Sequence, residues 1–104
     1  MNNKAVIDKI RQVAKDTLPS GSSLYLYGSR ARGDAHVDSD WDLLILVDKP
    51  SLTFHDYDMT YPFRMIGYDM GTDISPHIYT KKQWESWKFL PYYKNVEHDK
   101  MVII

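Results

Sequence analysis

The sequence predicts a mixed α+β domain, in which a small β-sheet is flanked by helices. Apolar residues recur with helical spacing over residues 6–18. Residues 23–27 alternate small or apolar side chains with aromatic ones, which is typical of a strand. Asp42 opens a continuous apolar run to Val47 that has the length of a strand buried on both faces. With 104 residues, the chain is expected to form one domain over 1–104.

The first half of the chain is expected to contain a helix, two strands and a polar connection. Pro19 and Gly21 end the first helix, because proline and glycine commonly follow a last helical turn. Gly28 ends the first strand, and residues 29–35 are polar with room for two helical turns. A loop over 48–51 follows the second strand.

The segment after this loop predicts a helix over about 55–69, in which Pro62 would kink or begin a helix. Residues 73–79 predict a third strand. Pro76 confines that strand to an edge or a bulge, because proline cannot donate to the ladder.

The last helix is predicted over 81–88, with Thr80 as its N-cap. Leu90 and Pro91 end that helix, and residues 101–104 form an apolar tail. The predicted order is therefore α-β-α-β-α-β-α.

Composition excludes several classes of protein. The 13 basic and 14 acidic side chains give a net charge of −1, which argues against a general nucleic-acid binder. The absence of cysteine excludes disulfides, thiol chemistry and cysteine-based zinc sites. No apolar run approaches about 18 residues, and the N-terminus lacks the apolar core of a signal peptide. We therefore expect a cytoplasmic protein with no membrane segment.

Aspartate dominates the acidic residues, and its placement points to a site. A predicted strand runs into Gly28 and Ser29, where a short helix begins, and helix N-termini with nearby glycine bind phosphate. Asp40 and Asp42 stand two residues apart, so their carboxylates share one face of a strand. Mg²⁺ binds through carboxylates plus substrate phosphate oxygens, and the segment therefore predicts a magnesium-nucleotide site.

Other motifs fail on detail. Asp34 stands where a phosphate-binding P-loop needs lysine. In an EF-hand alignment, Leu43 replaces the glycine and Lys49 the bidentate glutamate. The four histidines show no metal-ligand spacing.

The Gly-Ser pair, the ten-residue interval and the Asp-x-Asp before an apolar strand resemble the DNA polymerase β-like nucleotidyltransferase superfamily, most closely its minimal nucleotidyltransferases. The resemblance implies the polymerase β-like fold, Mg²⁺ and a nucleoside triphosphate, usually ATP. It also implies a HEPN-type protein partner, since such pairs form toxin–antitoxin systems in which the nucleotidyltransferase modifies the toxin.

The resemblance carries over to particular residues. Gly28 and Ser29 resemble the turn that grips phosphates, and Arg30 and Arg32 lie close enough in sequence to steady the triphosphate, with the inward-pointing one left open. Asp40 and Asp42 resemble the catalytic, metal-binding pair.

A third carboxylate normally stands on a later strand, before a segment that resembles Tyr-Thr-x-x-x-Trp. In this chain that segment is 79–84, and counting back from it reaches Ser75. Asp73, two residues earlier on the same strand face, is the candidate third catalytic and metal-binding residue. Without it the protein would bind nucleotide but turn over slowly.

Three functions follow. The first is Mg²⁺-dependent transfer of a nucleoside monophosphate, AMP from ATP, to a hydroxyl on a HEPN-type toxin. The second is a nucleotide-binding or inactive antitoxin that masks its partner. The third is modification of a small molecule such as an antibiotic. Because the chain is too short to carry a further recognition domain, a protein partner or a homo-oligomer is expected to complete the site.

The last third is rich in aromatic residues interleaved with lysines, which allows core packing, a partner-binding surface or, least favoured, RNA binding. These aromatic residues are Tyr79, Trp84, Trp87, Phe89, Tyr92 and Tyr93.

Overall fold

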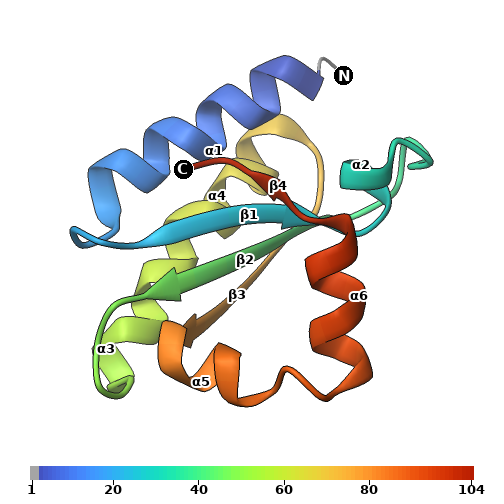
Figure 1. The fold of residues 1–104 in the computed structure, drawn as a ribbon. Helices are drawn as coiled ribbons and strands as arrows, with labels where there is room; N and C mark the ends of the chain where they lie inside the picture. Colours follow the sequence, from blue (N-terminus) through green and yellow to red (C-terminus); the bar gives the residue numbers. More distant parts are fainter. Residues whose placement is uncertain (1–2) are drawn as a thin grey trace.

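The computed structural model describes residues 3–104 and folds as a mixed sheet with helices on both faces (Figure 1). The elements in order are α1 (Asn3–Thr17), β1 (Ser23–Tyr27), α2 (Ser29–Arg32), β2 (Trp41–Val47), α3 (Phe54–Tyr57), the 3-10 turn η1 (Asp58–Thr60), α4 (Tyr61–Met70), β3 (Ile74–Thr80), α5 (Lys81–Ser86), α6 (Pro91–Asp99) and β4 (Met101–Val102). The predicted α+β class is confirmed.

The sheet has the strand order β3-β2-β1-β4. β1 pairs antiparallel with β2 and β4, whereas β3 runs parallel to β2. Asp42 on β2 stands between Tyr27 on β1 and Ser75 on β3. β3 is an outer strand, as Pro76 predicts.

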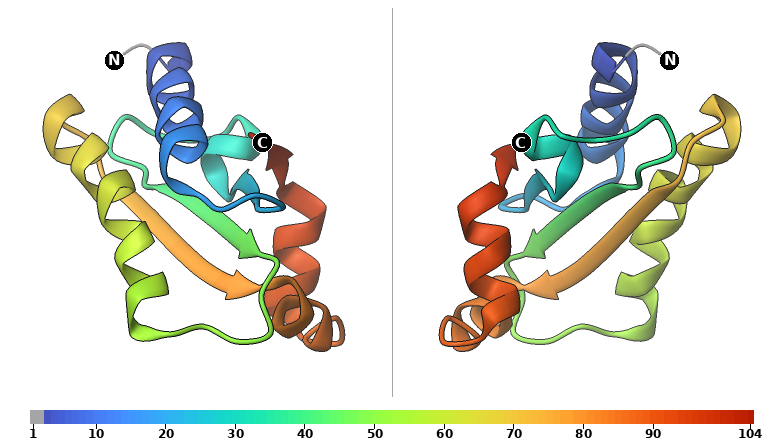
Figure 2. Two further views of the ribbon diagram at one scale, coloured as in Figure 1. Left: turned by 90° about the vertical axis from the view of Figure 1, so that its left-hand side faces the viewer. Right: turned by 90° about the vertical axis from the view of Figure 1, so that its right-hand side faces the viewer.

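One face of the sheet packs against α1 and α4 (Figure 2). Val6 and Ile10 of α1 and Phe63 and Ile66 of α4 are buried in one cluster with the alternate strand residues that face them. Leu43 lies in this cluster and is fully buried.

The other face packs against α5 and α6. Leu44 and Leu46 of β2 form a second cluster with Trp84 and Val96. Asp42 belongs to this face by strand alternation, next to the cluster and nearer the beginning of β2.

The aromatic residues of the last third divide between core and surface. Trp84 is buried, and Tyr79, Trp87 and Tyr93 pack against it, which agrees with core packing for these four. Phe89 and Tyr92 are exposed.

The predicted order stops at the helix over 81–88, whereas the structure adds α6 and β4 after it. Pro91 begins α6, because proline fits the first helical turn, where no backbone N–H is needed. β4 is only two residues long, and its pairing with β1 is a long-range contact that local sequence does not signal.

Two helical predictions were too long or too regular. The polar stretch after Gly28 forms a single turn, α2, which Gly33 ends in the left-handed conformation. The helix predicted over 55–69 is divided by η1, and Pro62 lies in the first turn of α4. Asp40 lies just before β2 and not on the strand.

Within residues 3–104 there is no helix with the length and apolarity needed to cross a membrane.

Candidate nucleotide and metal site

Asp40 and Asp42 lie at the beginning of β2, where β1 ends on the neighbouring strand. Asp40 is exposed in the preceding loop, whereas Asp42 is half-buried within the strand. Tyr27, the last residue of β1, is the register partner of Asp42, so Gly28 and Ser29 follow directly beside the carboxylate. The predicted phosphate-binding turn and the predicted acidic pair are thus brought together.

Gly28 is required by the position of Asp42. Its φ of 76° and ψ of −158° lie in a region that almost only glycine occupies. A Cβ at this position would come within 2.5 Å of Asp42 Oδ2. The close approach of the glycine backbone to the carboxylate is therefore part of the site.

The electrostatics of Asp42 suit a cation. Burial raises the pKa of its carboxyl, and the charge of Asp40 raises it further, while His77 and Arg32 partly oppose this. A pair of carboxylates that is only partly compensated by positive charge is a donor set for a hard divalent cation.

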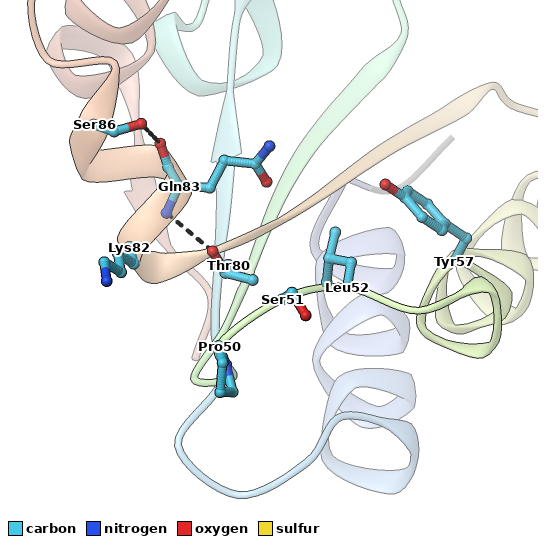
Figure 3. A pocket seen from close by; sticks show the side chains of 8 residues that line it. All are labelled: Pro50, Ser51, Leu52, Tyr57, Thr80, Lys82, Gln83 and Ser86. Carbon is cyan, nitrogen blue, oxygen red and sulfur yellow. Dashed lines mark hydrogen bonds between the residues drawn. The ribbon is translucent and has the colours of Figure 1, made fainter.

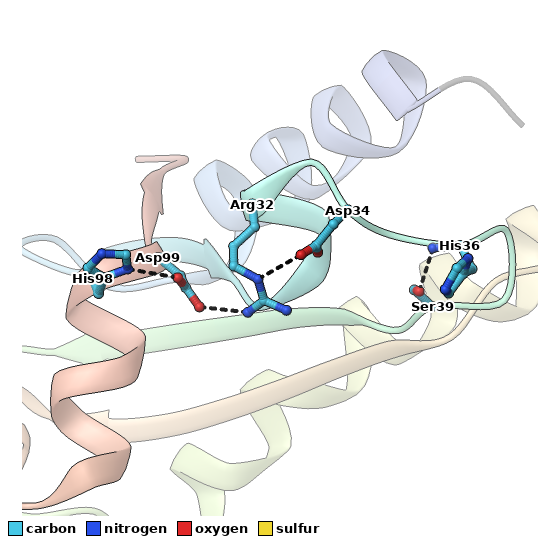
Figure 4. Close-up of polar contacts among 6 residues, drawn as sticks. All are labelled: Arg32, Asp34, His36, Ser39, His98 and Asp99. Atoms are coloured by element: carbon cyan, nitrogen blue, oxygen red, sulfur yellow. Dashed lines mark hydrogen bonds and ion pairs between the residues drawn. The ribbon is translucent and has the colours of Figure 1, made fainter.

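Arg32 of α2 reaches toward Asp99 at the end of α6 (Figure 4). Its guanidinium donates to Asp99 of α6 at 2.8 Å and to Asp34 at 3.2 Å. The hydrogen bond from Arg32 lowers the pKa of Asp99. The end of α6 therefore fixes Arg32, the one of the two predicted arginines whose charge lowers the pKa of Asp42.

Arg30 has a different environment. Its guanidinium donates to the carbonyl oxygens of Ser39 and Val37 at 3.0 and 3.2 Å, and it lies over the Trp41 ring at 4.7 Å from the centroid. These contacts fix the loop that precedes Asp40, so Arg30 braces the acidic pair through the backbone.

Ser29 is half-buried and begins α2. Among residues 3–104, no side chain caps this turn. The first turn of a helix leaves backbone N–H groups without helical partners, which is the arrangement predicted for phosphate.

The structure separates the two candidates for a third acidic position. Ser75 is the register partner of Asp42, whereas Asp73 is exposed and precedes β3. The Asp73 carbonyl accepts from the Trp41 N–H at 2.8 Å, which places its backbone beside Trp41, the residue between Asp40 and Asp42. Among residues 3–104, no three Asp, Glu, His or Cys side chains are grouped to hold one metal ion.

Three further residues near Asp42, namely Tyr27, His77 and Tyr92, were not predicted as site residues. Tyr27 and Tyr92 approach with their hydroxyl oxygens 3.2 Å apart, and His77 Nε2 lies 3.4 Å from Ser75 Oγ. Burial raises the pKa of Tyr92 to about 12 and lowers that of His77, so both side chains are neutral near pH 7. The register that brings Tyr27 and His77 here, and the helix that carries Tyr92 and Asp99, have no local sequence signal.

A hollow of about 530 Å³ lies at the other end of β2 and β3, away from Asp42 (Figure 3). Its wall contains Ser51, Thr80, Gln83 and Lys82, with no carboxylate. The acidic pair is remote from it, because Asp42 is the second residue of β2 and this hollow lies beyond the end of that strand.

The family follows from comparison with known proteins. The sequence model of the nucleotidyltransferase domain matches residues 7–103. The chain belongs to the nucleotidyltransferase domain family. The match includes the Gly28–Ser29 turn and both aspartates, so the family assignment agrees with the predicted resemblance. No curated protein sequence matches this nucleotidyltransferase domain significantly.

Solved structures share the fold of this nucleotidyltransferase domain. A toxin–antitoxin complex crystallised with AMP-PNP aligns with a TM-score of 0.68 at 18% identity, covering 94% of this chain and 72% of the other. A MntA–HpeT toxin–antitoxin mutant with two aspartates, two positions apart, replaced by glutamate has a TM-score of 0.65 at 15% identity, covering 94% and 71%. A second MntA–HpeT mutant, with a tyrosine replaced by alanine, has a TM-score of 0.61 at 17% identity, covering 98% and 72%. At these identities the likeness shows the fold alone.

Proposed function

We propose that this nucleotidyltransferase domain transfers AMP from ATP to a hydroxyl on a HEPN-type toxin, and so acts as the antitoxin of the pair. The observation that carries the proposal is the contact of the Gly28 turn with the half-buried carboxylate of Asp42. The toxin–antitoxin neighbours, one crystallised with AMP-PNP, support a nucleotide and a protein partner for this chain too.

Mg²⁺ fits the acidic pair, since this ion is usually held by one or two carboxylates while phosphates and water fill its other positions. Asp40 and Asp42 would hold it. When bound, Mg²⁺ neutralises charge on the triphosphate.

The reaction forms a bond from the acceptor oxygen to the α-phosphorus and breaks the bond from that phosphorus to the β-phosphate oxygen, so pyrophosphate leaves. In this proposal the Gly28–Ser29 turn grips the leaving phosphates through backbone N–H groups. Arg32, already oriented by Asp99, steadies their charge. Arg30 contributes by fixing the loop that carries Asp40.

The role of Asp73 as third acidic residue remains a separate part of the proposal. Its support is the backbone bond to Trp41, which ties the beginning of β3 to the acidic pair. An Asp73 carboxylate that reaches the acceptor would take its proton as general base.

The direct test is to incubate the purified chain with ATP labelled on the α-phosphate, Mg²⁺ and the HEPN-type protein encoded beside it. Label is expected on the HEPN-type protein with the wild-type chain and not with Asp40→Ala. Equal labelling by both, or none by either, contradicts the proposal.

A second function is favoured by the serine at position 75 and by the absence of a three-ligand group among the described residues. In this alternative the chain neutralises its partner by masking it, with little or no transfer. Asp42→Ala that still neutralises the toxin fully in cells would support masking, whereas loss of neutralisation supports transfer.

A further inference from the structure

The helical rod formed by α3, η1 and α4 carries an exposed aromatic stripe. Phe54, Tyr57, Tyr61 and Tyr68 are 93%, 54%, 61% and 80% exposed. Their spacing, with Arg64 between the last two, alternates three and four residues, which places them along one side of a helix. The opposite side of α4 carries the buried Phe63 and Ile66.

The stripe lies beside the free edge of the sheet, since the rod runs along β3 (Figure 2). One hollow of about 260 Å³ lies between Tyr57, Arg64 and the β3 residues 76–79. A second, of about 150 Å³, lies between Arg64, Tyr68 and the beginning of β3. A large aromatic surface with hollows along it is unusual for a surface that faces only water.

We propose that this aromatic stripe is the docking surface for a helix of the acceptor-bearing protein partner, an inference that rests on the proposed function. The three-four spacing suits a helix, because a partner helix packs along such a seam. The stripe spans residues 54–68, which at 1.5 Å per residue gives roughly 20 Å, or about four turns of contact.

The charge of Arg64 indicates which side chains the partner helix carries. Within residues 3–104, the guanidinium of Arg64 makes no ion pair or hydrogen bond, although it stands among the aromatic side chains. A carboxylate on the docked helix would form an ion pair with the guanidinium of Arg64. Asp69 and Asp73 at the Tyr68 end argue against RNA, because they would repel its phosphates.

The Tyr68 end of the stripe lies near the loop that precedes Asp40. Tyr68 and Asp73 share a hollow of about 320 Å³ with Val37 and Asp38, which belong to the loop before Asp40. A helix docked on the stripe therefore ends beside the loop that leads to Asp40, and the acceptor hydroxyl has to reach the acidic pair from there.

The test measures binding of the purified HEPN-type protein by calorimetry. Tyr61→Glu with Tyr68→Glu places charges in the stripe, and Arg64→Glu is an independent second variant. Phe89→Glu is the matched control, because Phe89 is 80% exposed on the α5–α6 connection. All four substitutions in these three variants are on the surface, so unchanged melting temperatures are expected.

The double variant and Arg64→Glu are expected to weaken binding by about 30-fold or more, whereas Phe89→Glu changes it by about two-fold or less. Normal binding by the double variant overturns the proposal, and so does loss of binding by Phe89→Glu alone. No binding by the wild-type chain overturns it too. If the wild-type chain is a dimer and the double variant is a monomer, the stripe binds a second copy of the chain, and the proposal is contradicted.

Labelled ATP separates this inference from the proposed function. If the wild-type chain binds the partner through the stripe but transfers no label, the proposed function is contradicted and the docking proposal is retained. Equal label transfer by wild type and double variant at limiting partner concentration supports the function and overturns the stripe. Asp42→Asn is expected to bind the partner normally without transfer.

Discussion

A side chain at position 28 and the carboxylate of Asp42 exclude each other, since a Cβ on Gly28 would lie 2.5 Å from Asp42 Oδ2. The glycine also has backbone angles that cost other residues about 1–3 kcal/mol. Gly28→Ala is therefore expected to destabilise the fold by at least that amount and to abolish nucleotidyl transfer, measured by urea unfolding and label transfer.

Gly33→Ala is the matched control, because Gly33 also has positive φ but a Cβ there meets nothing within 4 Å. We expect it to cost about 1 kcal/mol and to retain transfer. If the two variants lose the same activity, the approach of Gly28 to Asp42 is not what the site needs.

The ionised carboxylate of Asp42 is expected to destabilise the folded state in the absence of a cation. Its folded pKa is raised by burial and by Asp40, so the folded state favours the protonated acid. Stability is lost as pH rises through this raised pKa, and the cost persists above it. Without Mg²⁺ at pH 7, Asp42→Asn is expected to unfold at a higher urea concentration than wild type.

This gain should vanish below the ordinary carboxyl pKa of about 3.9, where both proteins carry a neutral group. Adding Mg²⁺ and ATP should stabilise the wild-type chain and not Asp42→Asn. A wild-type chain that is more stable than Asp42→Asn without Mg²⁺ at pH 7 would show that the carboxylate is stabilised by contacts with the protein itself.

Ser75 offers a position for one more carboxylate, because it is the register partner of Asp42. Ser75→Asp is expected to lower the melting temperature without a divalent cation, since like charges directly opposite on a sheet repel. With Mg²⁺ and ATP it should gain more stability than wild type does. Ser75→Ala, which adds no charge, should show neither effect, and an equal Mg²⁺ response in both variants would argue against a cation beside Asp42.

Asp73→Asn tests the third acidic residue predicted from the sequence. If the Asp73 carboxylate serves as base or ligand, label transfer should fall by about 100-fold, with AMP-PNP binding little changed. Transfer within about two-fold of wild type would leave the chemistry to Asp40 and Asp42.

The two arginines of α2 are expected to differ. Arg30→Ala removes charged hydrogen bonds to Ser39 and Val37 and the contact with Trp41, so it should destabilise the fold by about 2 kcal/mol. Arg32→Ala should change stability little, because it is exposed, and weaken AMP-PNP binding about ten-fold. Thermal unfolding and calorimetry check both, and a reversed pattern would exchange their roles.

Local sequence determined the first strand, the buried second strand and the edge position of β3. It also indicated the Gly28–Ser29 turn and the pair formed by Asp40 and Asp42. These features follow from periodicity, proline chemistry and residue spacing, which act over a few residues. The same rules misassigned Pro91 as a helix end, because proline both follows one helix and begins the next.

Only the tertiary structure decided which side chains meet. The register of β1, β2 and β3 places Tyr27 and Ser75 on either side of Asp42, and α6 brings Asp99 to Arg32. Packing also decided exposure, since it buried Trp84 and left the Tyr61 side of α4 open. Strand register and helix packing depend on contacts between residues far apart in the chain, so no local pattern determines them.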